Sequence, residues 1–143
     1  MAIKEIENQI EAEFQNLNDW MDKYNHLIEM GKLLPLIDEK LKVDNNLISG
    51  CQSRVWLAAT YEKGRVHFSA DSDAMITKGI ISMLIRVLSG QTPDAIINAS
   101  LDFIGRIGLK EHLSPTRSNG MDAMIKQMKL YAIVFKAKEL QLP

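Results

Sequence analysis

The hydrophobic residues of this chain follow a helical period near both ends and alternate, as in β-strands, only in the middle. Apolar side chains repeat at helical spacing in residues 3–17, 20–28, 75–88 and 121–135. Between the first two and the last two of these segments, residues 53–70 alternate between apolar and polar side chains. Because the strands are consecutive and do not alternate with helices, we expect an α+β fold with a small antiparallel sheet of about three strands packed against helices.

The middle of the chain predicts a β-hairpin preceded by a short strand. Residues 53–61 are rich in β-forming side chains, and residues 65–70 form the return strand. The short loop 62–64 contains Gly64, as hairpin loops commonly do. Residues 47–48 could add a third strand that leads into the loop holding Cys51.

Capping residues predict where several helices begin and end. Gly31 stands where the second helix should end in a left-handed cap, before Pro35. The Asp-Ser-Asp run 71–73 is expected to open a long central helix by capping its free amides. The last helix is expected to start near Arg117.

Length and charge narrow the possible functions. The 143 residues suit one domain spanning residues 1–143. The formal net charge of −1, from 17 basic and 18 acidic side chains, offers no attraction for a phosphate backbone, so we expect no nucleic-acid partner. No apolar run approaches the roughly 20 residues of a membrane span, and residues 1–13 lack the apolar stretch of a signal peptide. We therefore expect a cytoplasmic protein without a membrane partner.

Cys51 is the single cysteine of the chain, which excludes several kinds of site. The chain can form no internal disulfide, no zinc site built on several thiolates and no self-contained iron–sulfur cluster. The Asp-Ser-Asp run lacks the further ligands of a calcium loop, and no glycine pattern suits a phosphate or dinucleotide. We expect no metal site and no cofactor.

The position of Cys51 favours a reactive thiol over a structural one. A lone cysteine is most often a small core residue, yet Cys51 follows Gly50 in a loop, where functional groups tend to lie. Arg54, three residues later, could lower the pKa of the thiol. His26, His67 and His112 show no pattern that would complete a cysteine hydrolase with it.

Residues 50–56, Gly-Cys-Gln-Ser-Arg-Val-Trp, resemble the signature of the SufE family of sulfur acceptors. Other segments resemble that family in the same order and at similar spacing, so that the likeness covers nearly the whole chain: residues 20–35, 71–79 and 113–120. Ala70 departs from the glycine expected before residues 71–73. Gln52 and Ser53 favour SufE itself over its sister branch, CsdE.

The resemblance implies a fold shared with iron–sulfur scaffold proteins of the IscU type. It also implies that Cys51 accepts sulfur, as a persulfide, from the pyridoxal-phosphate cysteine desulfurase SufS. The protein would stimulate that enzyme and deliver the sulfur to the SufBCD scaffold for iron–sulfur cluster assembly. The chain itself would then be an accessory carrier rather than an enzyme.

Further site residues follow from the resemblance. It implies that Gly50, Gln52, Ser53 and Arg54 shape the cysteine loop, that Asp73 anchors the neighbouring helix start, and that Arg117 supports the loop or a partner contact. Two alternatives remain: a non-catalytic interaction domain in which Cys51 is structural, and a thiol enzyme such as a peroxidase or an acyl-transfer protein.

Overall fold

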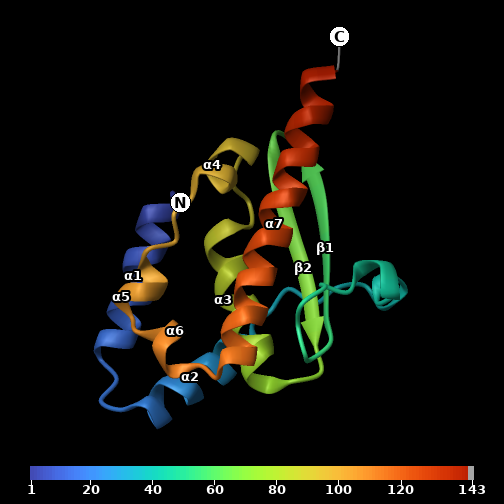
Figure 1. The fold of residues 1–143 in the computed structure, drawn as a ribbon. Coiled ribbons are helices and arrows are strands. Elements are labelled where there is room, and N and C mark those ends of the chain that lie inside the picture. The colour runs from blue at the N-terminus through green and yellow to red at the C-terminus, as the bar shows by residue number, and fades with distance from the viewer. Residues whose placement is uncertain (142–143) are drawn as a thin grey trace.

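The computed structural model describes residues 1–141, which form helices packed around one small sheet (Figure 1). Within these residues the two-stranded sheet is accompanied by seven α-helices and two short 3-10 helices. In chain order the elements are α1 (Ile3–Gln15), α2 (Trp20–Lys32), η1 (Glu39–Leu41), η2 (Asp44–Asn46), β1 (Val55–Glu62), β2 (Arg65–Ser72), α3 (Met75–Leu88), α4 (Pro93–Asn98), α5 (Phe103–Arg106), α6 (Leu109–His112) and α7 (Pro115–Gln141). The predicted α+β class is confirmed.

The predicted β-hairpin is present and has a two-residue turn. β1 and β2 pair antiparallel over their whole length, from Val55 opposite Ser72 to Glu62 opposite Arg65. Lys63 and Gly64 both have positive φ angles, 53° and 76°. Two consecutive positive φ angles are typical of the tight turns that match the twist of a hairpin.

The expected third strand is reduced to one bridge. Leu47 pairs with Trp56 in an isolated antiparallel bridge, and the Ile48 amide donates to the Val55 carbonyl at 2.9 Å. η2 ends immediately before Leu47, and the chain turns at Gly50, whose φ is 92°. Too few residues stay extended between these two bends to make a strand.

The last helix, α7, lies along the hairpin and buries the face that the sequence predicts. The Tyr61 and Phe135 rings stack with centroids 5.3 Å apart, and α7 runs beside the strands in Figure 1. Met121, Met124, Met128 and Ala132 are buried, although the helix begins at Pro115 rather than near Arg117. Among residues 1–141, no helix has the length and hydropathy needed to cross a membrane.

The helices α2 and α3 cross with their backbones in contact, which overturns the expected cap at Gly31. α2 continues through Gly31 to Lys32. A Cβ atom at Gly31 would lie 3.1 Å from the backbone nitrogen of Gly79, and a Cβ at Gly79 would overlap the Leu27 carbonyl oxygen. Gly31 therefore allows the two helices to pack closely and does not terminate α2.

The Asp-Ser-Asp run does not open the central helix as expected. Asp71 and Ser72 are the last residues of β2, and α3 begins at Met75 after the N-cap residue Ala74, with no side-chain cap. The Asp71 carboxylate instead contacts the ammonium groups of Lys42 and Lys78, at 3.1 and 3.3 Å. Ionic contacts with neighbouring segments outweigh local capping here.

Candidate functional site

Cys51 lies in the loop that enters β1 and rests on α7. The loop turns at Gly50, where the left-handed φ of 92° favours glycine. Space is also limited at that position, because a Cβ atom on Gly50 would lie 3.3 Å from the Ala123 side chain of α7. The thiol is half-buried. Both the positive φ angle and the close approach of α7 therefore favour glycine at position 50.

The thiol of Cys51 points at the first turns of α7. Its Sγ donates to the Gly120 carbonyl oxygen at 3.5 Å. A Cβ atom at Gly120 would lie 3.5 Å from that sulfur and 3.9 Å from the Cys51 Cα. The absence of a side chain at Gly120 therefore lets the loop approach the helix, and the Gly120 carbonyl gives the resting thiol an acceptor.

The expectation that Arg54 lowers the pKa of Cys51 is wrong. Burial raises the pKa of the Cys51 thiol, because a thiolate would lose solvation there. Arg54 is exposed and acts through its backbone: its amide donates to Asp73 Oδ1 at 3.1 Å, and its carbonyl accepts from the Asp73 amide at 3.3 Å. Asp73 thereby fixes the end of the cysteine loop beside α3, while leaving the amides of the α3 N-terminus uncapped.

A pocket of about 340 Å³ opens beside the thiol. It is lined by Cys51, Gln52, Ser53, Thr77, Ile80, Ser114, Thr116, Arg117, Gly120 and Met124. Of the residues singled out from the sequence, Cys51, Gln52, Ser53 and Arg117 line the pocket. Gly50, Arg54 and Asp73 do not: Gly50 forms the turn of the loop, and Arg54 and Asp73 are hydrogen-bonded to each other at its end. The pocket is formed by three segments, namely the cysteine loop, the first two turns of α3, and the first turns of α7 with Ser114 before them.

Several pocket residues were not predicted, most clearly Thr77 and Gly120. Thr77 falls on the apolar repeat of α3 and resembles an ordinary helix residue. Gly120 lies at the end of a segment that resembles the SufE family, and this likeness was its only signal. Neither position could be placed beside Cys51 without knowing how α3 and α7 pack.

Arg117 is the only charged residue among those lining the pocket. It lies in the first turn of α7, where its backbone amide donates to Ser114 Oγ at 3.3 Å, and its side chain is exposed. A guanidinium at the mouth of the pocket favours the binding of an anionic group. Within residues 1–141, no cluster of three or more His, Cys, Asp or Glu side chains could hold a metal ion.

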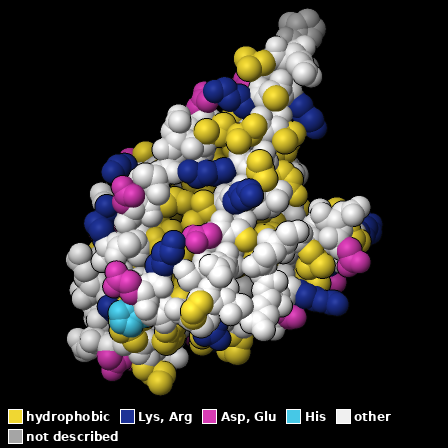
Figure 2. Space-filling model, viewed as in Figure 1, with side chains coloured by type: hydrophobic (Ala, Val, Ile, Leu, Met, Phe, Trp, Pro, Cys, Tyr) yellow, Lys and Arg dark blue, Asp and Glu magenta, His cyan; other side chains and the backbone are white. Residues whose placement is uncertain are grey.

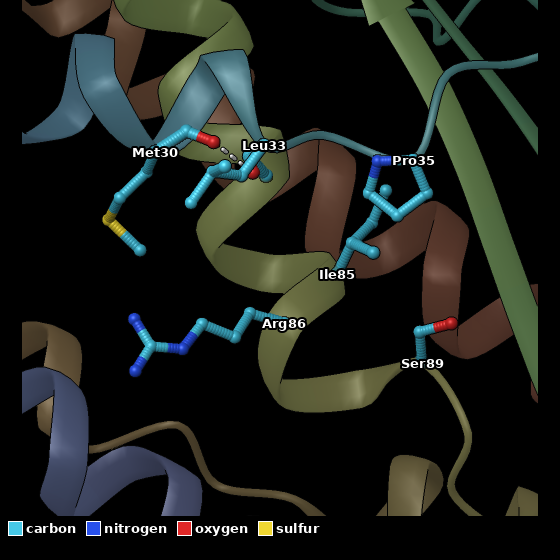
Figure 3. Close-up of a pocket in the computed structure, with 7 residues that line it drawn as sticks. Met30, Leu33, Pro35, Ile85, Arg86 and Ser89 are labelled. Atoms are coloured by element: carbon cyan, nitrogen blue, oxygen red, sulfur yellow. Dashed lines mark hydrogen bonds between the residues drawn. The ribbon is translucent and has the colours of Figure 1, made fainter.

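A second cavity, of about 410 Å³, lies away from Cys51, between the ends of α2 and α3 (Figure 3). Met30 and Arg86 project to the same side of the two helices in that view. The Arg86 guanidinium is bound by the Glu13 carboxylate, at 3.0 and 2.5 Å. Its two serine hydroxyls are engaged as well: Ser82 Oγ donates to the Met30 carbonyl, and Ser89 Oγ accepts from the Phe68 amide.

The face drawn in Figure 2 carries basic and acidic side chains interspersed around α7, with hydrophobic side chains between them. No extended basic surface is present on that face. An uninterrupted basic surface is the usual mark of a site for a nucleic-acid backbone.

Comparisons with known proteins agree with the α+β fold. The fold resembles a solved protein from Thermus thermophilus, described only as hypothetical, with a TM-score of 0.74 at 21% identity, over 90% of this chain and 93% of that one. SufE-like proteins, described as uncharacterized, are 38% identical over 128 residues in Rhizobium meliloti (85% of this chain, 91% of the relative) and in Synechocystis (90% of this chain, 80% of the relative).

Residues 8–132 match the family described as SufE, an Fe-S metabolism associated domain. This match places the α+β protein, with its single thiol beside a pocket, in a family of iron–sulfur metabolism. The chain belongs to the SufE family.

Proposed function

We propose that this protein is a sulfur carrier that accepts sulfane sulfur on Cys51 and passes it on for iron–sulfur cluster assembly. The observation that carries the proposal is the position of the chain's single cysteine, whose Sγ faces a pocket that also contains Arg117. A carrier of one sulfur atom needs one thiol and space beyond it. The pocket of about 340 Å³ has room for an added sulfur atom.

The chemistry is an exchange between sulfur atoms. The Cys51 thiolate attacks the terminal sulfur of a persulfide on the donor protein. The bond between that sulfur and the donor cysteine breaks, a new S–S bond forms to Cys51, and the donor thiolate leaves. The proton of the Cys51 thiol goes to solvent or to the donor, and no external oxidant is needed because the terminal sulfur keeps its oxidation state.

The donor is a pyridoxal-phosphate cysteine desulfurase of the SufS type, and the acceptor is the SufBCD scaffold. The carrier uses no cofactor of its own and is no enzyme by itself. It removes the product sulfur from the desulfurase and so raises its turnover. This assignment places the protein in the cytoplasm, where free cysteine and the assembly machinery meet.

Arg117 and the loop residues have supporting roles in this proposal. The guanidinium of Arg117 attracts the negative charge that develops on the donor sulfur as its thiolate leaves. Gln52 and Ser53 form the wall of the pocket next to the thiol. Asp73 keeps the end of the loop in place through its contacts with the Arg54 backbone.

Stimulation of desulfurase turnover tests the proposal. With excess cysteine, addition of this protein should increase the rate of alanine formation by a SufS-type desulfurase, and Cys51→Ser should abolish the increase. If Cys51→Ser folds and stimulates as well as the natural sequence, the protein is an interaction domain with a structural cysteine.

The same assay measures the contribution of Arg117. We expect Arg117→Ala to reduce the stimulation about tenfold, the effect of losing one contact to a charged sulfur. Lys126→Ala is the control, because Lys126 is an exposed cation on the same helix outside the pocket. Equal stimulation by both variants would remove Arg117 from the proposed site.

A further inference from the structure

Thr77 is a buried residue with a free hydroxyl at the Cys51 pocket. It lies in the first turn of α3, lines the pocket and is 7% exposed. The other hydroxyl-bearing residues of the pocket, Ser53, Ser114 and Thr116, are half-buried or exposed. Among the described residues, the Thr77 side chain has no hydrogen-bond partner, although a helical threonine often bonds the preceding turn.

The free hydroxyl has access to the pocket. Within residues 1–141, no buried side-chain oxygen or nitrogen is both sealed from solvent and without a partner. The Thr77 oxygen therefore belongs to the small part of this side chain that remains accessible. Because Thr77 lines the pocket beside Cys51, we place that oxygen on the pocket wall. An accessible hydroxyl without a protein partner is available to donate a hydrogen bond to a group that enters the pocket.

A persulfide on Cys51 would need such a donor. The resting thiol donates its proton to the Gly120 carbonyl, but a persulfide anion has no proton to donate and is repelled by a carbonyl oxygen. Its terminal sulfur would lie about 2.05 Å beyond Sγ, the length of an S–S bond, in the space that the pocket provides.

We propose that the Thr77 hydroxyl donates a hydrogen bond to the terminal sulfur of the Cys51 persulfide and so holds it as the anion. This inference rests on the proposed function and adds a positioning residue to it. The bond protects the cargo, because nucleophiles attack a neutral persulfide more readily than an anionic one. The other charged groups near the loop are Arg117 on α7, which is exposed at the mouth of the pocket, and Arg54 with Asp73 at the loop end.

The test follows the loss of sulfur from the loaded protein as a function of pH. The chain is loaded with a desulfurase and cysteine, repurified, and treated with a water-soluble triarylphosphine. The phosphine takes the terminal sulfur as phosphine sulfide and leaves the Cys51 thiol, so the phosphine is oxidised and the persulfide is reduced. Intact mass gives the fraction still loaded, and the rate should fall as pH rises through the persulfide pKa.

Thr77→Val removes the hydroxyl and keeps the branched shape. We expect the midpoint of the pH profile to rise by about one unit and the loss above it to accelerate about tenfold, the effect of one hydrogen bond to an anion. Thr77→Ser keeps a donor and should restore the natural midpoint. Because the Thr77 hydroxyl has no partner in the resting protein, Thr77→Val should not lower stability.

Ser82→Ala is the control for a lost buried hydroxyl on the same helix. Ser82 Oγ donates to the Met30 carbonyl at 2.7 Å, away from the pocket, so this variant should lower stability and leave the midpoint unchanged. Normal loading with the same midpoint in Thr77→Val and the natural sequence would overturn this inference alone. Failure of the natural sequence to load at all would overturn the proposed function.

Discussion

At the scale of single residues, Cys51 differs from the activated cysteines of enzymes. Enzymes lower the pKa of a nucleophilic thiol with nearby cations or a helix N-terminus. Here burial raises the pKa of Cys51, and its proton is directed to the Gly120 carbonyl. Such a thiol is mostly protonated and weakly nucleophilic at neutral pH. Low reactivity towards small solutes suits the proposed role, in which Cys51 reacts with a donor persulfide.

The raised pKa predicts slow alkylation of the folded protein. With iodoacetamide, the rate for Cys51 should rise with pH at a higher midpoint than in the urea-unfolded chain, because only the thiolate reacts. Intact mass follows the reaction without ambiguity, since the chain has one cysteine. Equal midpoints in the folded and unfolded chains would contradict the effect of burial.

The same shift links Cys51 to stability. A pKa that is higher in the fold than in the unfolded chain stabilises the fold while the thiol is protonated. That contribution is complete below the ordinary thiol pKa and is lost as pH rises through the raised value. The natural sequence should therefore lose stability relative to Cys51→Ser in alkaline solution.

At the scale of elements, the contact between α2 and α3 holds the central helix in place. Gly31 and Gly79 let the two backbones touch, and Ser82 adds a hydrogen bond to the Met30 carbonyl. Thr77 lies in the first turn of α3 and lines the Cys51 pocket. The contact with α2 therefore also fixes the position of Thr77 beside that pocket.

Gly79→Ala should destabilise the protein. The new Cβ would overlap the Leu27 carbonyl, and overpacking of this kind costs about 1–3 kcal/mol. Gly105→Ala is the matched control, because a Cβ there meets no atom within 4 Å; it should be neutral or stabilise by up to about 1 kcal/mol. Urea unfolding measures both, and equal stabilities would contradict the close crossing.

The elements that could be predicted from the sequence are those with strong local signals. The hairpin follows from alternation and its turn from Gly64, and the α7 core face follows from spaced methionines. Gly31 and Asp73 were misassigned because their roles depend on partners distant in sequence, Gly79 and Arg54.

The candidate site also has features that could be predicted from the sequence and features that could not. Residues in and next to the loop, with Arg117, could be found by resemblance to the SufE family, and four of them line the pocket. The raised pKa of Cys51, the carbonyl of Gly120 and the free hydroxyl of Thr77 arise only when the loop, α3 and α7 pack together. No local pattern encodes these properties.

At the scale of the whole molecule, the pocket brings three distant segments to one thiol. The loop after η2, the start of α3 and the start of α7 contribute to it, while α2 and the hairpin fix the last two in space. The fold thereby gives its single cysteine a defined pocket, and the proposed role in sulfur transfer depends on this property.

The central claim is that Cys51 carries sulfur, and intact mass tests it most directly. The purified chain is incubated with a cysteine desulfurase and free cysteine, and its mass is measured without reductant beside that of Cys51→Ser. The account predicts a gain of one or more sulfur atoms, reversed by reductant and absent in the variant. No gain with several active desulfurases, in a protein that remains folded, would contradict it.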